Sequence, residues 1–423
     1  MREGLREKLN MVTDIRLPAE ILTAILEKVD VQDLWHVRMA SRTLCAAVNP
    51  IVFRVVSVIS ATGKVQNLAG LIDIPDIAVH IREVFYFGTN DHWDLSHCAS
   101  SSPHSINLIM TFLCVRWWVT SPLSVGTMRH SDPKLESSFS KFLSHIHQLP
   151  RLETINFWFS PMYHVSLSSD SGRCPPLQAS FLAALTASFS VCAPSNLTTL
   201  SLQCLLVSGF PPESAPFLTH LTPALRRLYL SVHNKIPLDD VRWCNFWTTF
   251  FPRIILAPVQ RSLTDLKLGS NMAIGSSSGL SFAGLYFPHL FALSLSNFFW
   301  EPSVGIELFI LRHANTLARL HLYPCSLPEA RLRLLSPSPS PSTALAEAEE
   351  LSNRWEQIWD RFAAEITALV EFCTYNSSYA IYDSDGYVRW TDVSESCKAA
   401  DIVALQCFQT TVAARSKETC TKS

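Results

Sequence analysis

A short leucine pattern recurs along the chain and restricts the fold more than any other feature of the sequence. In six segments, a leucine is followed by Leu, Ile or Phe at the fourth and sixth positions. The intervals between the first residues of successive segments are 45, 28, 38, 27 and 27 residues. Recurrence at such intervals is typical of a solenoid built from repeated supersecondary units. The segments begin at Leu152, Leu197, Leu225, Leu263, Leu290 and Leu317.

Amphipathic stretches separate these segments, and each is long enough for a helix. They cover residues 137–149, 181–191, 241–251 and 304–313. Strand followed by helix, repeated, predicts an α/β fold with a curved solenoid over residues 76–335. The pattern resembles an irregular leucine-rich repeat, because three of the five intervals lie in its usual range and Asn271 and Cys325 occupy its customary Asn or Cys position. Ile81-Arg-Glu-Val84-Phe-Tyr86 is a candidate earlier unit, with an insertion before Leu152.

Alternation within each strand buries the leucines and places the residues between them on the opposite, concave face. Taken singly, each of these residues would be ordinary solvated surface. Together they form an extended surface of the kind that solenoids use for binding, and Trp, Tyr and Arg are common at binding hot spots. The sequence therefore predicts that this face binds a target protein. The candidate residues are Asn156, Trp158, Arg227, Tyr229, Asp265, Lys267, Arg319 and His321, and Thr199, Ser201 and Ser294 are predicted to share the face.

A separate helical pattern occupies the N-terminal part of the chain. Apolar residues from Leu17 to Val29 fall at helical spacing, which predicts a helix beginning near Pro18. A second helix is predicted over 34–39, and a third is predicted to begin after Ser41 and to stop at Pro50. So small a unit cannot bury three apolar stripes by itself, so part of this surface must meet the following domain or a partner.

The order of residues from Leu17 to Leu44 resembles an F-box. The matching positions are Leu17-Pro18, Glu20-Ile21-Leu22, Ile25-Leu26, Asp33-Leu34, Val37-Arg38, Ser41-Arg42 and Leu44, the last of which replaces a bulky aromatic residue that is common in the family. The resemblance implies that residues 14–53 bind a Skp-type adaptor and, through it, a cullin scaffold. The plain alternative is a helical cap on the solenoid. The resemblance assigns Leu17, Pro18, Ile21, Leu22, Leu26, Leu34 and Val37 to adaptor-facing or module-core positions.

The C-terminal part, residues 344–415, is predicted to cap the solenoid with a helix and a hairpin. Alternating Ser and Pro over 336–342 indicate an exposed loop that ends the regular repeats. Helix formers with regularly spaced apolar residues then predict a helix over 344–372. Asp385-Gly386, between aromatic-rich stretches, predicts the turn of a hairpin over 379–390.

Charge, cysteine spacing and motifs argue against several classes of function. The net charge of −2 leaves no basic footprint for nucleic acid, and the N-terminus lacks a secretory signal, so we expect an intracellular protein without a membrane partner. The 12 cysteines form no C-x-x-C pair, so we expect no metal site. The G-x-S-x-G match at 275–279 lies in a small-residue loop, not at a strand-to-helix turn, and we expect neither enzymatic activity nor a cofactor.

Three functional hypotheses follow from the sequence. The first is a substrate-recognition adaptor of a Skp/cullin/F-box ubiquitin ligase, with the F-box binding the Skp-type adaptor and the solenoid binding an unknown target. The second is an F-box scaffold or inhibitor that acts outside a ligase. The third is an enzyme with a helical N-terminal cap, which would need a catalytic site that the motifs do not reveal.

Overall fold

The computed structural model describes most of the repeat region and both flanking parts of the chain. The described residues are 17–59, 68–88, 133–159, 176–192, 194–207, 224–233, 241–275, 278–328, 354–375, 378–382, 388–391 and 395–422. The predicted Ser-Pro loop, the hairpin turn at Asp385-Gly386, and Ser277 of the G-x-S-x-G match lie outside these residues.

Three helices follow one another at the N-terminus, where the sequence predicts them: α2 (Ala19–Leu26), α3 (Val31–Ala40) and α4 (Arg42–Val52). The hydroxyl of Ser41 accepts a hydrogen bond from the backbone N–H of Leu44 at 3.1 Å and so caps α4. The predicted stop at Pro50 is wrong, because α4 continues to Val52. A proline in the last turn removes a single hydrogen bond, and Phe53 still donates its N–H to the carbonyl of Asn49.

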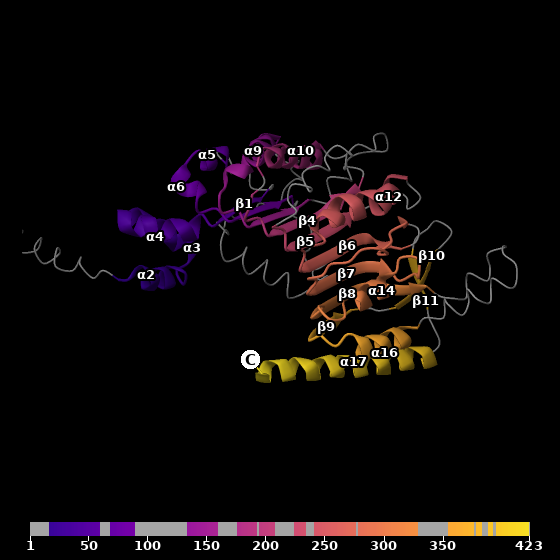
Figure 1. The fold of residues 1–423 in the computed structure, drawn as a ribbon. Helices are drawn as coiled ribbons and strands as arrows, with labels where there is room; N and C mark the ends of the chain where they lie inside the picture. Colours follow the sequence, from indigo (N-terminus) through magenta and orange to yellow (C-terminus); the bar gives the residue numbers. More distant parts are fainter. Residues whose placement is uncertain are drawn as a thin grey trace, which may run out of the picture.

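These helices have a small hydrophobic core of their own. Leu26, Leu34, Val48 and Val52 are buried together, and Leu22, Val29, Val37, Ala47 and Ile51 pack around them partly buried. This cluster is separate from the large core of the solenoid. Figure 1 shows the three helices at one end of the molecule, beside β1.

Parallel strands stack in sequence order to form the solenoid (Figure 1). Each pairs with the next in a register that aligns the repeat leucines, so that Leu200, Leu228, Leu266, Leu293 and Leu320 form one row. The strands are β1 (Val55–Ile59), β2 (Glu83–Phe87), β3 (Thr154–Trp158), β4 (Thr199–Leu206), β5 (Arg227–His233), β6 (Asp265–Ile274), β7 (Ala292–Phe299), β8 (Arg319–Pro328) and β9 (Glu371–Thr374).

Backbone hydrogen bonds before each strand repeat from unit to unit. The carbonyl of Arg226 accepts the N–H groups of Thr264 and Asp265 at 2.8 and 3.0 Å, and that of Thr264 accepts those of Phe291 and Ala292 at 2.7 and 3.0 Å. The same arrangement, in which one carbonyl accepts two successive N–H groups, recurs in every unit from the carbonyl of Arg54 to that of Ala318. It holds successive units in register irrespective of the length of the segment between them, which explains how unequal intervals share one solenoid.

Within the described residues, helical segments lie between β1 and β2, β2 and β3, β3 and β4, β5 and β6, β7 and β8, and β8 and β9. They are α5 (Leu68–Ile72), α6 (Pro75–Ala78), α9 (Pro133–Ser144), η2 (Ile146–Gln148), α10 (Pro176–Val191), α12 (Val241–Asn245), the π-helix η6 (Phe246–Leu256), α13 (Ala257–Val259), α14 (Ile306–Arg312) and α16 (Trp355–Glu365). The four predicted amphipathic stretches all overlap these helical segments.

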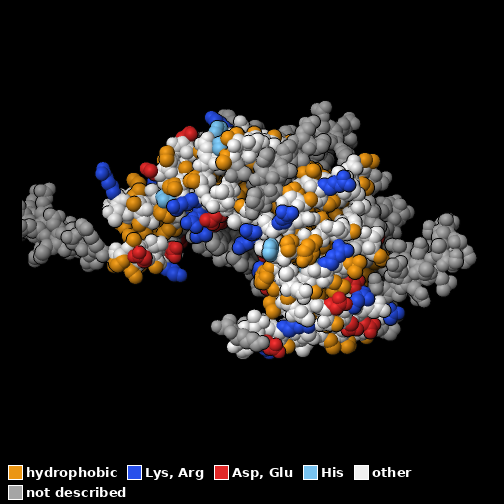
Figure 2. Space-filling view, in the orientation of Figure 1, with side chains coloured by type: hydrophobic (Ala, Val, Ile, Leu, Met, Phe, Trp, Pro, Cys, Tyr) orange, Lys and Arg blue, Asp and Glu red, His pale blue; other side chains and the backbone are white. Residues whose placement is uncertain are grey.

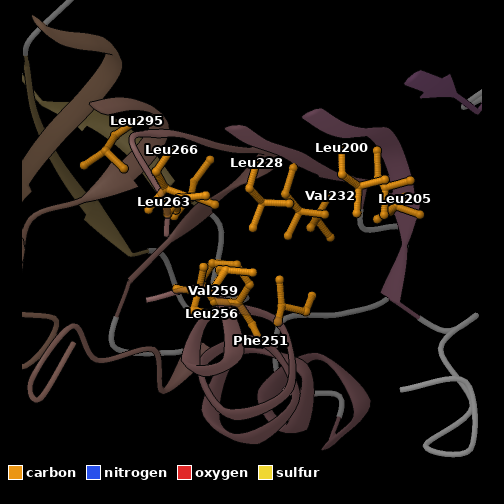
Figure 3. Packing of buried hydrophobic residues seen from close by; sticks show 14 of the residues in the cluster. Leu200, Leu205, Leu228, Val232, Phe251, Leu256, Val259, Leu263, Leu266 and Leu295 are labelled. Carbon is orange, nitrogen blue, oxygen red and sulfur yellow. The ribbon is translucent and has the colours of Figure 1, made fainter. Parts of the chain in front are cut away.

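Figure 3 shows how strands and helical segments share the core. Leu228, Val232 and Leu266 point from β5 and β6 toward Phe251 and Leu256 of the π-helix. These side chains are at most 1% exposed. Within the described residues, the π-helix therefore packs on the leucine-bearing face of the sheet.

The solenoid extends further in both directions than the predicted residues 76–335. The candidate unit at Ile81 is confirmed as a strand, because β2 pairs with β3 in parallel. The chain also adds β1 before it, paired with β2, and β9 after β8. The predicted helix over 344–372 is wrong at its C-terminal end, because α16 ends at Glu365 and Glu371–Thr374 form a strand.

The C-terminal hairpin and a long helix complete the fold. β10 (Ser378–Tyr382) pairs antiparallel with β11 (Val388–Thr391), as predicted, and β10 also pairs in parallel with the end of β8. Within the described residues, eleven strands thus belong to one sheet. The sequence did not predict α17 (Glu395–Lys422), which packs against α16 through Phe408 and lies at the opposite end from the N-terminal helices (Figure 1).

Candidate protein-binding surface

The face of the sheet opposite the helical layer carries the side chains that alternate with the buried leucines. Strand register aligns them across the solenoid. The central row runs Phe85, Asn156, Ser201, Tyr229, Lys267, Ser294, His321 and Cys373. We refer to this surface, from β2 to β9, as the concave face.

All eight predicted target-binding residues lie on the concave face, on strands β3, β5, β6 and β8. Asn156, Trp158, Tyr229, Asp265, Lys267, Arg319 and His321 are partly exposed, and Arg227 is exposed. Thr199 and Ser201 share this face, as predicted, but both are buried. Ser201 lies between Asn156 and Tyr229 in the strand register, and these larger side chains flank its short one.

One end of the concave face is aromatic. Phe87 of β2 stacks on Trp158 of β3, with ring centroids 6.1 Å apart and planes 26° apart. Phe85 lies one alternation earlier on β2, and all three rings are partly exposed. Phe85 and Phe87 are not among the binding residues predicted from the sequence. The alternation of Phe85 and Phe87 with Val84 and Tyr86 was the signal that could have identified them.

The other end of the concave face is rich in charge, but much of that charge is internally paired. Arg319 donates to Asp265 at 3.1 Å, and the guanidinium group also lies 4.9 Å from the ring centroid of Phe291. The second carboxylate oxygen of Asp265 accepts from the hydroxyl of Thr264 at 2.7 Å. His321 lies 2.9 Å from a carboxylate oxygen of Glu371 on β9. Two of the four predicted basic residues therefore already have acidic partners.

Lys267 differs from these residues. It lies on β6 between Tyr229 and Ser294, and no hydrogen bond or ion pair joins its ammonium group to any residue that the structure describes. Burial lowers the pKa of Lys267. Burial, with the nearby carboxylate of Asp265, raises the pKa of Tyr229, so its hydroxyl stays protonated as a donor at neutral pH.

A second surface lies on the N-terminal helices. The seven residues that the F-box resemblance assigned divide into two groups: Leu26 and Leu34 are buried and Leu22 and Val37 partly buried, whereas Leu17, Pro18 and Ile21 are exposed. Ile25 continues the exposed stripe. Leu17, Ile21 and Ile25 are 45%, 50% and 48% exposed, which is high for apolar side chains at helical spacing. Figure 2 shows hydrophobic side chains exposed on this part of the molecule.

Among the described residues, no group of three or more His, Cys, Asp or Glu side chains is arranged to hold a metal ion. In the same part of the chain, every helix is too short or too polar to cross a lipid bilayer, α17 included.

Comparisons with known proteins add little to this picture. No protein-family model matches the sequence, and no curated protein matches it. Among solved structures, the leucine-rich-repeat-containing protein LegL7 from Legionella pneumophila matches over 83% of this chain and 97% of its own, with 13% sequence identity and a TM-score of 0.27. A TM-score this low carries no argument about function. The F-box resemblance therefore rests on residues 17–44 alone.

Proposed function

We propose that this protein is the substrate-recognition subunit of a Skp/cullin/F-box ubiquitin ligase. The N-terminal helices would bind the Skp-type adaptor, and the concave face would bind the target protein. In this proposal the chain makes and breaks no bonds. It tethers a target close to the ubiquitin-charged partner enzyme and so raises the local concentration of the target lysine.

The exposed apolar stripe of Leu17, Ile21 and Ile25 carries the proposal. Leu17 lies just before α2, and Ile21 and Ile25 lie on it. The small core of the N-terminal helices is formed by other residues, Leu26 and Leu34 among them. An apolar stripe that stays exposed while a core forms beneath it is typical of a protein-binding surface. The resemblance of residues 17–44 to an F-box names the partner class.

The decisive experiment measures binding of a purified Skp-type adaptor by calorimetry. We expect the wild type to bind and the Ile21→Asp, Ile25→Asp double variant to lose binding, because two charges would be buried without partners at the interface. Leu308→Asp is the matched control, since Leu308 is 60% exposed on α14, in the solenoid. A folded wild type that binds no adaptor would refute the F-box assignment.

Affinity purification from cells then distinguishes a ligase subunit from a scaffold. Recovery of both adaptor and cullin with the wild type, and of neither with the double variant, supports the ligase. Adaptor without cullin favours the scaffold or inhibitor. Proteins recovered with the wild type but lost with alanine at Trp158, Arg227 and Tyr229 are candidate targets. If the same proteins remain bound to that triple variant, the concave face is not the target-binding surface.

A further inference from the structure

Lys267 is a partly buried basic group of the concave face, and none of the residues that the structure describes supplies it with an acidic partner. Arg319 and His321 have Asp265 and Glu371 as partners, at 3.1 and 2.9 Å. The carboxylate nearest along β6, Asp265, is occupied by Arg319 and by the hydroxyl of Thr264. An ammonium group that is partly withdrawn from water and lacks a counter-ion is costly, and an anion supplied by a partner would offset that cost.

The neighbours of Lys267 are suited to hold an anion. Strand register places the hydroxyl-bearing side chains of Tyr229 and Ser294 on either side of it. Both can donate hydrogen bonds to a carboxylate or phosphate oxygen, and Arg227, which is exposed two residues before Tyr229 on β5, adds a second positive charge. In the view of Figure 2, blue side chains stand over the region where Figure 1 draws β4 to β8, and red ones gather nearer α16.

The aromatic end of the face lies at a defined separation from Lys267. Trp158 lies on β3, three strands away from β6. It is two residues further along its strand than Asn156, which shares the central row with Lys267. With strands about 4.8 Å apart, the two side chains are separated by roughly 15 Å. An extended peptide advances about 3.3 Å per residue and presents every second side chain to the same face, so residues four apart span most of this distance.

We propose that the concave face binds an extended segment of the target protein in which an aromatic side chain and an anionic side chain lie four residues apart. The aromatic side chain packs on Phe87 and Trp158, and the anionic group binds the ammonium of Lys267 between Tyr229 and Ser294. The anion is a glutamate carboxylate or a phosphoserine phosphate, which share the chemistry that this site recognises. This inference rests on the proposed function, since it defines the target segment for the same face.

The test uses the full-length protein and fluorescein-labelled ten-residue peptides in a Gly/Ser background. One peptide carries Trp and Glu four residues apart, one replaces Glu with phosphoserine, one replaces it with Gln, and one places Trp and Glu adjacent. We expect one or both anionic peptides with the four-residue spacing to bind at least about tenfold more tightly than the Gln peptide and the adjacent peptide. Equal binding of the Gln peptide, or no binding of either anionic peptide, would overturn the inference.

Substitutions of Lys267 test whether the anionic group of the peptide binds there. Lys267→Met keeps the aliphatic stem and removes the charge, so the fold should persist and anionic-peptide binding should fall at least about tenfold, whereas Lys267→Arg should retain most of it. Lys141→Met, which removes one exposed charge from α9, is the matched control and should leave binding unchanged. Thermal unfolding of each variant checks that it remains folded. Unchanged binding in Lys267→Met refutes the site.

Target binding separates failure of this inference from failure of the proposed function. If a target is lost with Trp158→Ala but retained with Lys267→Met, the concave face keeps its role and only the anion site is wrong. If neither variant loses it, both the anion site and target binding by this face are wrong.

Discussion

Gly279 is a residue at which backbone and packing together exclude a side chain. Its φ of +67° lies in the left-handed region, and a Cβ there would lie 2.5 Å from Cγ2 of Thr248. The hydroxyl of Thr248 donates to the carbonyl of Cys244 at 2.8 Å, which holds the methyl group in place. Gly284 has a φ of +80° but would meet nothing within 4 Å. A comparison of the two glycines therefore separates the cost of backbone strain from the cost of steric overlap.

We predict that Gly279→Ala destabilises the protein more than Gly284→Ala does. The left-handed backbone alone should cost each variant about 1–2 kcal/mol of unfolding free energy. The overlap with Thr248 should add to this cost in Gly279→Ala alone. In a Thr248→Ser background, which removes Cγ2, the cost of Gly279→Ala should fall to that of Gly284→Ala. Urea unfolding measures all four variants, and an equal cost for both glycines in the wild-type background would contradict the packing argument.

Sequence alternation predicted which residues of the concave face are exposed wherever the strand pattern alone decides the outcome. Trp158, Lys267 and His321 are examples, because a strand has a period of two and leucines mark its buried side. The prediction failed at Ser201, whose burial depends on the size of the residues beside it on two other strands. The ion pairs of the face could not be predicted either, because Asp265, the partner of Arg319, lies 54 residues away in the chain.

At the scale of elements, α17 supplies partners to both ends of α16. The carboxylate of Asp401 accepts the N–H of Glu356 at 2.9 Å and the hydroxyl of Tyr379 at 2.9 Å. Arg415 donates to the carbonyls of Ala363 and Ile366 at 2.7 Å each. An anion at the first turn of a helix and a cation at its last turn both interact favourably with the helix dipole. Their order along the chain also shows that the two helices run parallel.

We predict that Arg415→Met loosens the C-terminal end of α16 and the second half of α17. Two carbonyls would lose a charged donor in a partly buried position, which costs about 1.5–3 kcal/mol. Hydrogen exchange followed by mass spectrometry should show faster exchange in both helices and no change in β2 to β6. Lys417→Met, on the exposed side of the same helix, is the control. Unchanged exchange in Arg415→Met would show that Phe408 and its neighbours suffice to hold α17.

The boundary between α16 and β9 could not be predicted from the sequence, because it also depends on a partner that is distant in the chain. Residues 344–372 combine helix formers with regularly spaced apolar side chains, and local propensity favours one helix throughout. The outcome is decided by the carbonyl of Ala318, which accepts the N–H groups of Val370 and Glu371 at 2.9 and 3.0 Å and so begins a strand. Leu369-Val-Glu-Phe372-Cys-Thr374 follows the repeat pattern only loosely, with Thr at the last apolar position.

At the scale of the whole molecule, the N-terminal helices and the solenoid have separate cores that meet around Phe53. This ring packs partly buried against the solenoid core and lies 5.7 Å from the ring of Trp35 on α3. The guanidinium group of Arg38 lies 5.1 Å from the ring centroid of Phe53 and donates to the side chain of Asn49 at 2.8 Å. So narrow a connection allows the two parts to respond independently to a mutation.

We therefore predict that Leu34→Ala unfolds α2 to α4 and leaves the solenoid intact. Leu34 is 1% exposed, and removing so buried a leucine side chain costs about 2–5 kcal/mol, as much as a unit this small can gain from its core. Hydrogen exchange should accelerate throughout α2 to α4 and stay unchanged in β2 to β8. Leu17→Ala, the same change at an exposed position, should alter neither part. Faster exchange in the solenoid of Leu34→Ala would instead mean that the two cores fold as one, and that adaptor and target binding cannot be separated by mutation of the N-terminal core.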